Sequence, residues 1–162
     1  LLLSGGSGLS GANLLAPSSS ALFALGASGA IPVFGEGAWW TVLSATWLHA
    51  GLLHIRFNMM SLRNIGHDTV EIVGPGRTVI IYVVSGACGF LLSSLMGAAV
   101  PLIAQLPLPI PLLRLLVGAR LTVGASASIF GLLGALVHYG RKSGSSFIHT
   151  QAKQWALIMF LY

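Results

Sequence analysis

Three polar side chains in apolar stretches of this chain are of the types that acyl-transfer chemistry needs. Ser126 precedes the apolar run 129–137, and a hydroxyl costs free energy in hydrocarbon unless it is paired or faces a cavity. His54 and Asn58 are spaced i,i+4, so on a helix they share one face, and both can donate hydrogen bonds. A serine attacking a carbonyl needs such donors at the developing oxyanion. The pattern therefore suits a serine nucleophile with oxyanion donors, but a His/Asn pair in a membrane helix is at least as often a structural hydrogen-bonding pair, so both interpretations stay open on these residues alone.

The other histidines and the cysteine do not extend this site. A zinc-protease helix needs two histidines at i,i+4 with a glutamate between them, and residues 54–58 have neither; we expect no metal and no cofactor. His138 lies 12 residues beyond Ser126, about 18 Å along a helix, whereas a base must come within ~2.6–3.2 Å. His149 falls in a predicted cytoplasmic loop. Cys88 is the only cysteine, so it predicts a small packed residue and excludes an internal disulfide.

The composition is that of a membrane protein. Of 162 residues, 55% are hydrophobic and 7% are charged, against about 25% charged in soluble domains. No charged residue lies between Arg77 and Arg114 or between Arg120 and Arg141, and each run can supply the ~20 apolar residues of a spanning helix. The expected fold class is all-α, a polytopic helical membrane protein. The net charge of +5 forms no basic stripe, so no nucleic-acid partner is expected.

The apolar segments and their breakers predict the elements that must position the site. Three tryptophans (39, 40 and 47) are typical of an interfacial segment, and four prolines predict a loop or re-entrant segment at 102–116. The predicted elements are an interfacial region at 22–51, spans at 52–66, 78–99 and 126–140, and the start of a further span at 152–162.

Basic residues predict the orientation in the bilayer. Arginine and lysine favour cytoplasmic loops; five of them (Arg63, Arg77, Arg141, Lys142 and Lys153) flank two short predicted loops, against Arg114 and Arg120 on the other side. With those loops in the cytoplasm, the serine and the His/Asn pair lie toward the outer face, at a similar depth.

Two predicted spans carry small residues at every fourth position, which lets membrane helices approach closely. These faces are Ser85, Gly89 and Ser93 on one helix and Ala127, Gly131 and Ala135 on the other.

Three segments together resemble the rhomboid family of intramembrane serine proteases. Trp47–Met59 is similar to the family's second-helix signature, and Tyr82–Gly89 to its third helix. Gly124–Ala127, followed by Phe130–Ala135, is similar to its nucleophile motif. The resemblance covers roughly residues 22–162, with the motifs in the family's order.

The resemblance implies a Ser–His dyad that cleaves peptide bonds in or near transmembrane segments of client proteins within the lipid bilayer. Ser126 would be the nucleophile, and His54, Asn58 and the backbone N–H of Ser126 would form the oxyanion hole. Phe130 matches an aromatic position that packs against the catalytic imidazole, and His49 matches a histidine used structurally in the first loop.

The chain departs from the family pattern in three places. Ala127 replaces the usual glycine after the nucleophile, and Thr41 follows Trp40 where the family often has arginine. The family's general base is a histidine on its last core helix, which would lie beyond Tyr162. We therefore expect a single rhomboid-like domain cut at both ends, inactive as this fragment.

A second copy of the nucleophile motif is expected to be a turn. Residues 26–29 read Gly-Ala-Ser-Gly, but they precede an Ile-Pro pair and lie before the His/Asn helix, contrary to the family's order.

Two other functions compete with proteolysis. A non-catalytic rhomboid-like protein would bind membrane clients without cutting them. A transporter or channel would need paired ionisable groups in mid-membrane, and apart from Arg56 and the histidines we find none at that depth. We also expect a multi-pass protein of the bacterial plasma membrane.

Overall fold

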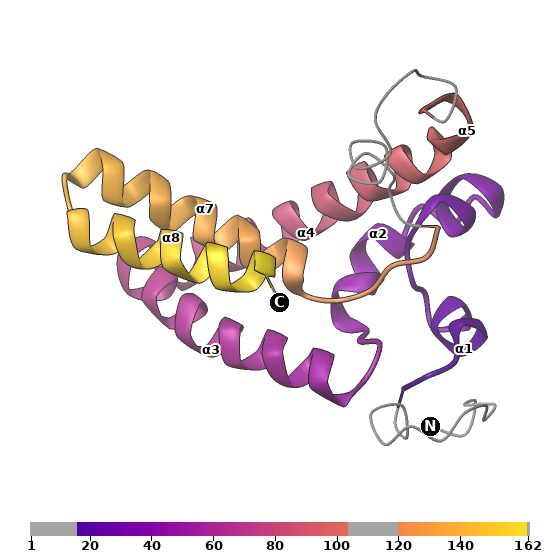
Figure 1. Cartoon of the computed structure of the whole chain (residues 1–162), viewed down its shortest axis with the longest axis horizontal. Helices are drawn as coiled ribbons and strands as arrows, with labels where there is room; N and C mark the ends of the chain where they lie inside the picture. Colours follow the sequence, from indigo (N-terminus) through magenta and orange to yellow (C-terminus); the bar gives the residue numbers. More distant parts are fainter. Residues whose placement is uncertain (1–15, 104–119, 162) are drawn as a thin grey trace.

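The computed structural model describes residues 16–103 and 120–161, and the chain is helical through most of them (Figure 1). The one extended pairing in these ranges is an isolated antiparallel bridge between Ser28 and Thr122. The predicted all-α class is therefore confirmed. The elements are α1 (Ser19–Ala24), the π-helical turn η1 (Ile31–Gly35), α2 (Thr41–Ser44), the 3-10 turn η2 (Ala45–Trp47), α3 (Leu52–Val73), α4 (Pro75–Ala98), α5 (Val100–Ile103), α7 (Ser126–Ser143) and α8 (Ser146–Leu161).

Helix α3 is longer than predicted. The expected span ended at residue 66, with a polar turn through His67 and Asp68, but the helix continues to Val73. Charged residues do not end a helix when their side chains face solvent, and His67 pairs along α3 with Glu71. The break comes at Gly74, whose φ of +84° favours glycine, and Pro75 then occupies the first turn of α4.

The other helix limits also differ from the predicted ones. Helix α7 extends to Ser143 rather than 140, and α8 begins at Ser146 rather than near 152. His149 is consequently part of α8 and not of a loop. The proline-rich loop predicted at 102–116 lies outside the described residues beyond Ile103.

Helix α4 has the character of a membrane span. Within the described ranges, it is the one helix that is both long and apolar enough to cross a bilayer, and only 17% of its most apolar window is buried. Helix α3 has 22 residues but carries Arg56, Arg63, Asp68 and Glu71, while the last turn of α7 contains Arg141 and Lys142.

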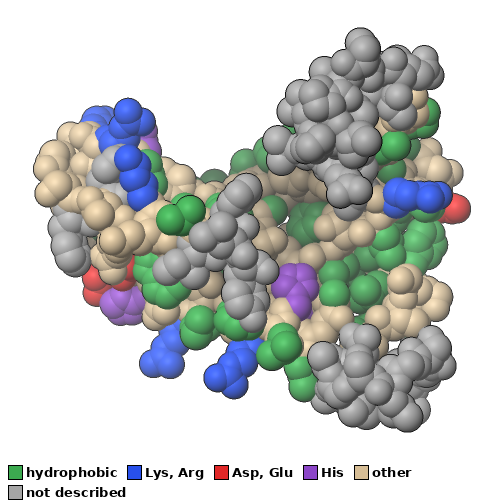
Figure 2. All heavy atoms as spheres, viewed as in Figure 1, with side chains coloured by type: hydrophobic (Ala, Val, Ile, Leu, Met, Phe, Trp, Pro, Cys, Tyr) green, Lys and Arg blue, Asp and Glu red, His purple; other side chains and the backbone are tan. Residues whose placement is uncertain are grey.

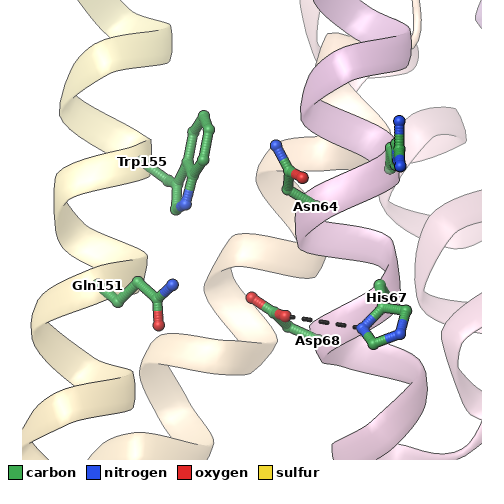
Figure 3. A pocket seen from close by; sticks show the side chains of 6 residues that line it. Asn64, His67, Asp68, Gln151 and Trp155 are labelled. Atoms are coloured by element: carbon green, nitrogen blue, oxygen red, sulfur yellow. Dashed lines mark ion pairs between the residues drawn. The ribbon is translucent and has the colours of Figure 1, made fainter.

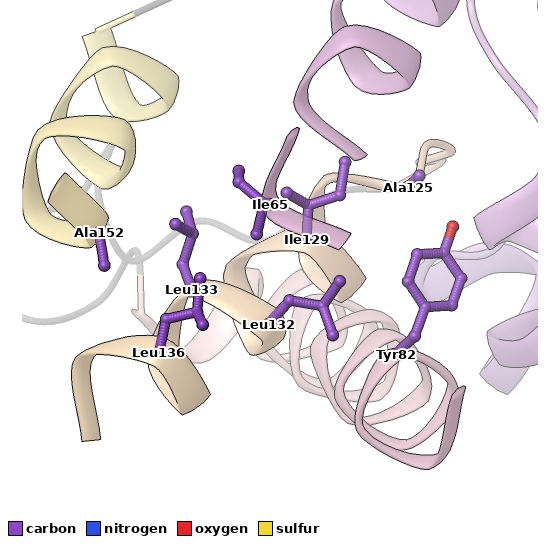
Figure 4. Packing of buried hydrophobic residues seen from close by; sticks show 8 residues of the cluster. All are labelled: Ile65, Tyr82, Ala125, Ile129, Leu132, Leu133, Leu136 and Ala152. Atoms are coloured by element: carbon purple, nitrogen blue, oxygen red, sulfur yellow. The ribbon is translucent and has the colours of Figure 1, made fainter. Parts of the chain in front are cut away.

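Helix α7 occupies the centre of the packing, against α3, α4 and α8. Its Ile129 and Leu132 are fully buried, together with Ile65 of α3 (Figure 4). Because lipid is as apolar as these side chains, close packing rather than water exclusion stabilises such an interface in a membrane. The buried cluster consists of Ile65, Tyr82, Ala125, Ile129, Leu132, Leu133, Leu136 and Ala152.

Small residues bring α4 and α7 together, as predicted. A Cβ added at Gly89 would lie 2.7 Å from the Cβ of Ala127. A Cβ added at Gly131 would collide with the Ser85 side chain. The Ser85 hydroxyl also donates to the backbone oxygen of Ser128 across the interface at 3.3 Å. The two backbones can approach this closely because neither face carries a large side chain.

The second Gly-Ala-Ser-Gly motif is structural. The Ser28 N–H donates to the Thr122 carbonyl at 3.0 Å, and the Ser28 side chain is fully buried. Its hydroxyl bonds to those of Ser94, at 3.4 Å, and Thr41, at 3.5 Å. The segment therefore anchors the approach to α7. The turn predicted at residues 26–29 is present only in part, because the chain turns at residues 25–26 while Ser28 forms the bridge and Gly29 a bend.

Candidate functional site

Ser126 is the first residue of α7 and is partly exposed. Its hydroxyl makes no hydrogen bond to any residue in 16–103 or 120–161. The other serine of the motif, Ser128, is fully buried and faces α4 at Gly86. Of these two hydroxyls, only that of Ser126 can meet a client peptide.

The start of α7 provides unused backbone donors next to Ser126. The first intrahelical bond runs from the Ile129 N–H to the Ala125 carbonyl, 3.0 Å long. The preceding N–H groups, beginning with that of Ser126, have no carbonyl one turn earlier in the helix. The positive end of the helix dipole adds to their attraction for negative charge. An oxyanion forming at Ser126 would be stabilised by these N–H groups and by the helix dipole.

His54 sits near the start of α3 and is fixed by a backbone contact. The Ala50 N–H donates to its Nδ1 at 3.3 Å. Because Nδ1 accepts this bond, the neutral imidazole carries its proton on Nε2, which makes Nε2 a donor. The same imidazole edge lies toward Gly124: a Cβ added there would be 2.8 Å from both Cε1 and Nε2 of His54.

Asn58 is buried one turn further along α3. Its Nδ2 donates to the His54 carbonyl at 2.9 Å and would be 4.0 Å from a Cβ at Gly124. An amide nitrogen has two hydrogens, so one remains after the bond to His54. The i,i+4 pair thus faces a single point on the chain, two residues before Ser126.

Gly124 lets α3 and the segment that leads into α7 approach each other closely. Its φ is +126°, which disfavours any residue with a side chain, and a side chain would also meet the His54 ring. The Gly124 N–H donates to the carbonyl of Ala45 in η2 at 3.0 Å, which fixes the strand-like approach to α7. Sequence reasoning placed Gly124 in the nucleophile motif without giving it this role, and its position just before the serine was the available signal.

His49 packs beside this site. Its ring lies 5.3 Å from that of His54 at an interplanar angle of 71°, and its Nε2 is buried with no hydrogen-bond partner among the described residues. Burial, and to a lesser degree the neighbouring imidazole of His54, lower the pKa of His49. A neutral His49 therefore supports the His54 ring edge-on, in keeping with the expected structural role.

Among the residues that the structure describes, no histidine is placed as a general base for Ser126. The chain has five histidines; apart from His49 and His54, they lie at position 67 on α3, at position 138 on α7 and at position 149 on α8. His138 is on the same helix as Ser126 and about 18 Å away along its axis. Phe130, one turn beyond Ser126, is 38% exposed, so no imidazole from the described residues covers it.

The comparisons with known proteins agree with the motifs. The family model of the Rhomboid domain matches residues 36–162. The chain is 38% identical to RHOMBOID-like protein 5 of Arabidopsis thaliana over 63% of its own length and 27% of that protein. It is 29% identical to rhomboid protease GluP of Bacillus subtilis (strain 168), over 73% of this chain and 19% of GluP.

A relative described as inactive is similar at the same level. The chain is 29% identical to inactive RHOMBOID-like protein 8 of Arabidopsis thaliana, over 76% of this chain and 30% of that protein. The chain thus spans less than a third of the length of each of these three relatives. No solved structure matches it. Since the Rhomboid domain covers most of the chain, from residue 36 to residue 162, the chain belongs to the rhomboid family of membrane proteins.

Proposed function

We propose that this chain carries the nucleophile and the oxyanion donors of a serine endopeptidase that cleaves membrane-protein clients in or near their transmembrane segments. The single observation that supports this most is the position of His54 Nε2 and Asn58 Nδ2 at Gly124, two residues before the partly exposed Ser126 at the start of α7. If the His/Asn pair were purely structural, its donor atoms would not need to lie beside an unpaired hydroxyl at a helix N-terminus.

In the proposed reaction, the Ser126 hydroxyl attacks the client's carbonyl carbon while a histidine acting as general base takes its proton. The carbonyl oxygen becomes an oxyanion, which His54, Asn58 and the Ser126 N–H stabilise. The same histidine then protonates the leaving amine, and the peptide bond breaks to give an acyl-enzyme. Water hydrolyses this ester and restores the serine. No cofactor takes part.

The test is covalent labelling of Ser126. A fluorophosphonate probe is added to the full-length gene product and to its Ser126→Ala and Ser128→Ala variants, in membranes. We expect labelling and client cleavage to be lost in Ser126→Ala and retained in Ser128→Ala, because Ser128 is buried. Equal labelling of the wild type and Ser126→Ala would refute the nucleophile assignment.

A non-catalytic client-binding protein is the second candidate. It is supported by the similarity to an inactive relative and by the lack of a histidine placed as a base for Ser126 within residues 16–103 and 120–161. It predicts that the full-length product captures transmembrane clients without cleaving them, and that Ser126→Ala leaves capture unchanged. The relatives quoted above come from a plant and a bacterium, so they give no preference to the bacterial plasma membrane expected from the sequence.

A further inference from the structure

A polar pocket lies between α3 and α8, at the end of the molecule opposite the serine. It has a volume of about 380 Å³ and is lined by Arg63, Asn64, His67, Asp68, Gln151 and Trp155. Figure 3 shows Asn64 and Asp68 on the side of α3 that faces α8, with Trp155 and Gln151 across the gap. None of these residues belongs to the proposed proteolytic site.

The pocket is rich in donors that the chain does not use. Arg63 offers five N–H groups, the amides of Asn64 and Gln151 two each, and Trp155 one. Within residues 16–103 and 120–161, none of these four side chains makes a hydrogen bond to the protein. Arg63 also lacks a carboxylate partner. The chain has only three acidic residues, and the ion pairs formed by Asp68 and Glu71 are both with His67, while Glu36 lies at the end of η1.

Two carboxylates border the site: Asp68 lines this pocket and the more apolar pocket beside it, and Glu71 lines the more apolar one. The ion-pair partner of each is a ring nitrogen of His67, at 4.0 Å from Asp68 and 3.7 Å from Glu71. Neither carboxylate pairs with Arg63, so its guanidinium and the amides are available to the acceptor oxygens of a ligand.

A second, more apolar pocket of about 220 Å³ adjoins the first, and the two share Asp68, Gln151 and Trp155. The apolar part of its lining consists of Ile72, Leu136, Ile148 and Ala152. A ligand with a polar acceptor group and an apolar chain would fill both parts.

The depth of the pocket matches a lipid headgroup in the cytoplasmic leaflet. Asp68 lies five residues before the end of α3 and Gln151 five residues after the start of α8, while Asn64 and Trp155 lie nine residues from those ends. At 1.5 Å per residue these levels are about 7 and 13 Å from the helix ends. Figure 2 shows Lys and Arg side chains gathered where α7 turns into α8, and Arg141 and Lys142 lie there. The positive-inside rule places that end in the cytoplasm, where anionic lipids are concentrated.

We propose that this pocket binds the phosphate headgroup of an anionic phospholipid from the cytoplasmic leaflet, with the start of an acyl chain in the apolar part. Arg63 and the side-chain amides hold the phosphate oxygens, and the Trp155 indole lies at the boundary between headgroup and acyl chain, as interfacial tryptophans do. The site is independent of the proposed protease chemistry, because it uses neither Ser126 nor the His/Asn pair.

The test measures lipid binding by the purified chain in neutral detergent, through native mass spectrometry and thermal unfolding. Dioleoyl phosphatidylglycerol is compared with dioleoyl phosphatidylcholine, and soluble glycerol phosphate serves as the free-anion probe. The variant is Arg63→Gln, and Arg56→Gln is its matched control: Arg56 lies two turns earlier on α3, is exposed, and lines neither pocket.

We expect phosphatidylglycerol to be retained and to raise the melting temperature of the wild type and of Arg56→Gln. In Arg63→Gln its affinity should fall about tenfold or more, since a charge-assisted bond to phosphate is lost. Gln151→Ala, which leaves every charge in place, should also weaken retention. An equal loss in Arg56→Gln and Arg63→Gln, or no preference for phosphatidylglycerol, would overturn the proposal. If glycerol phosphate stabilised the protein as much as phosphatidylglycerol does, the assignment to a lipid would be overturned. The same would follow if Arg63→Gln captured a client peptide more weakly while its lipid binding was unchanged.

Discussion

At the scale of single residues, only one or two contacts orient each of the two proposed oxyanion donors, His54 and Asn58. The His54 ring is held by one backbone N–H at Nδ1 and by the His49 ring against its face. Asn58 uses one of its hydrogens on a carbonyl of its own helix. Both donors are therefore oriented by local contacts, and a substitution at either should change catalysis more than folding.

Asn58→Ala should lower kcat of the full-length protease by about 10²–10³, the usual cost of removing one oxyanion donor. The melting temperature should change little, because the bond that is lost goes to a carbonyl within the helix. Met60→Ala, at an exposed position on α3 that lines neither pocket, is the control and should retain full activity. A similar fall in kcat for both variants would argue against the oxyanion role.

Gly124→Ala tests the contact between the loop and the His54 ring. The residue would adopt a φ of +126° with its Cβ 2.8 Å from the imidazole, so we expect a loss of about 1–3 kcal/mol of stability and displacement of His54. Gly76→Ala is the matched control, since its Cβ would meet nothing within 4 Å. Chemical unfolding and client cleavage are measured together. A fully active Gly124→Ala variant would show that the position of the ring is unimportant.

His49 makes stability depend on pH. Burial lowers its pKa below the ordinary 6.5 in the folded state, so when the pH falls through 6.5 the unfolded state takes up the proton first. Linkage then lowers the free energy of unfolding, and the loss is complete only below the folded pKa. Melting temperatures between pH 7.5 and 5 should fall more steeply for the wild type than for His49→Gln. His138→Gln, at an exposed position on α7, should keep the wild-type slope; parallel curves for all three proteins would refute this role.

At the scale of helices, the backbone contact between α4 and α7 determines where Ser126 lies. Gly89, Ala127 and Gly131 leave no room between the helices, so the start of α7 cannot shift along α4 without a clash. The bridge between Ser28 and Thr122 holds the preceding segment from the other side. Ser126 is thus placed by two contacts that involve neither its own side chain nor the His/Asn pair.

Gly131→Leu should separate α4 from α7, because its side chain would overlap Ser85. Overpacking of this kind costs typically 1–3 kcal/mol, and activity should fall with the shift of Ser126. Gly134→Leu adds the same side chain one turn later on α7, where a Cβ meets nothing within 4 Å. It should be stable and active. Comparable melting temperatures for the two variants would contradict the close packing.

The sequence motifs predicted which segments are helical and which helix faces meet. They did not predict as well the residues at which the helices begin and end. The i,i+4 spacing and the small-residue faces depend on helix geometry alone, and the structure brings together both the His/Asn pair and the Gly89–Ala127 contact. Where α3 ends could not be predicted from polarity, because exposed charges such as Glu71 extend a helix as readily as they end it. The contact between the His54 ring and Gly124 joins segments that are far apart in the sequence. It depends on the tertiary fold, so a local sequence pattern could not predict it.

At the scale of the whole molecule, the chain presents two differently built ends. Ser126, the His/Asn pair and His49 lie at one end of the α3–α7 pair, while the donor-rich pocket and the basic residues of the α7–α8 turn lie at the other. Helix α4, whose apolar surface is mostly unburied, packs beside this helix pair. On α3 the nearest residues of the two proposed sites, Asn58 and Arg63, are five residues apart, about 7.5 Å along the helix. The two sites share no residue, so we expect a variant of one site to leave the chemistry of the other unchanged.

This separation and the histidine positions together predict the behaviour of residues 1–162 as an isolated polypeptide. Among the described residues, no side chain is placed to act as a base for Ser126, which would have to lie within ~2.6–3.2 Å: His138 is about 18 Å away, and the Nδ1 of His54 already accepts from Ala50. The polypeptide should therefore cleave no client in liposomes. Arg63→Gln should not alter this result, and the full-length product should cleave the same client under the same conditions. Robust cleavage by residues 1–162, abolished by Ser126→Ala, would mean that His54 takes the serine proton itself and would reverse its role from donor to base.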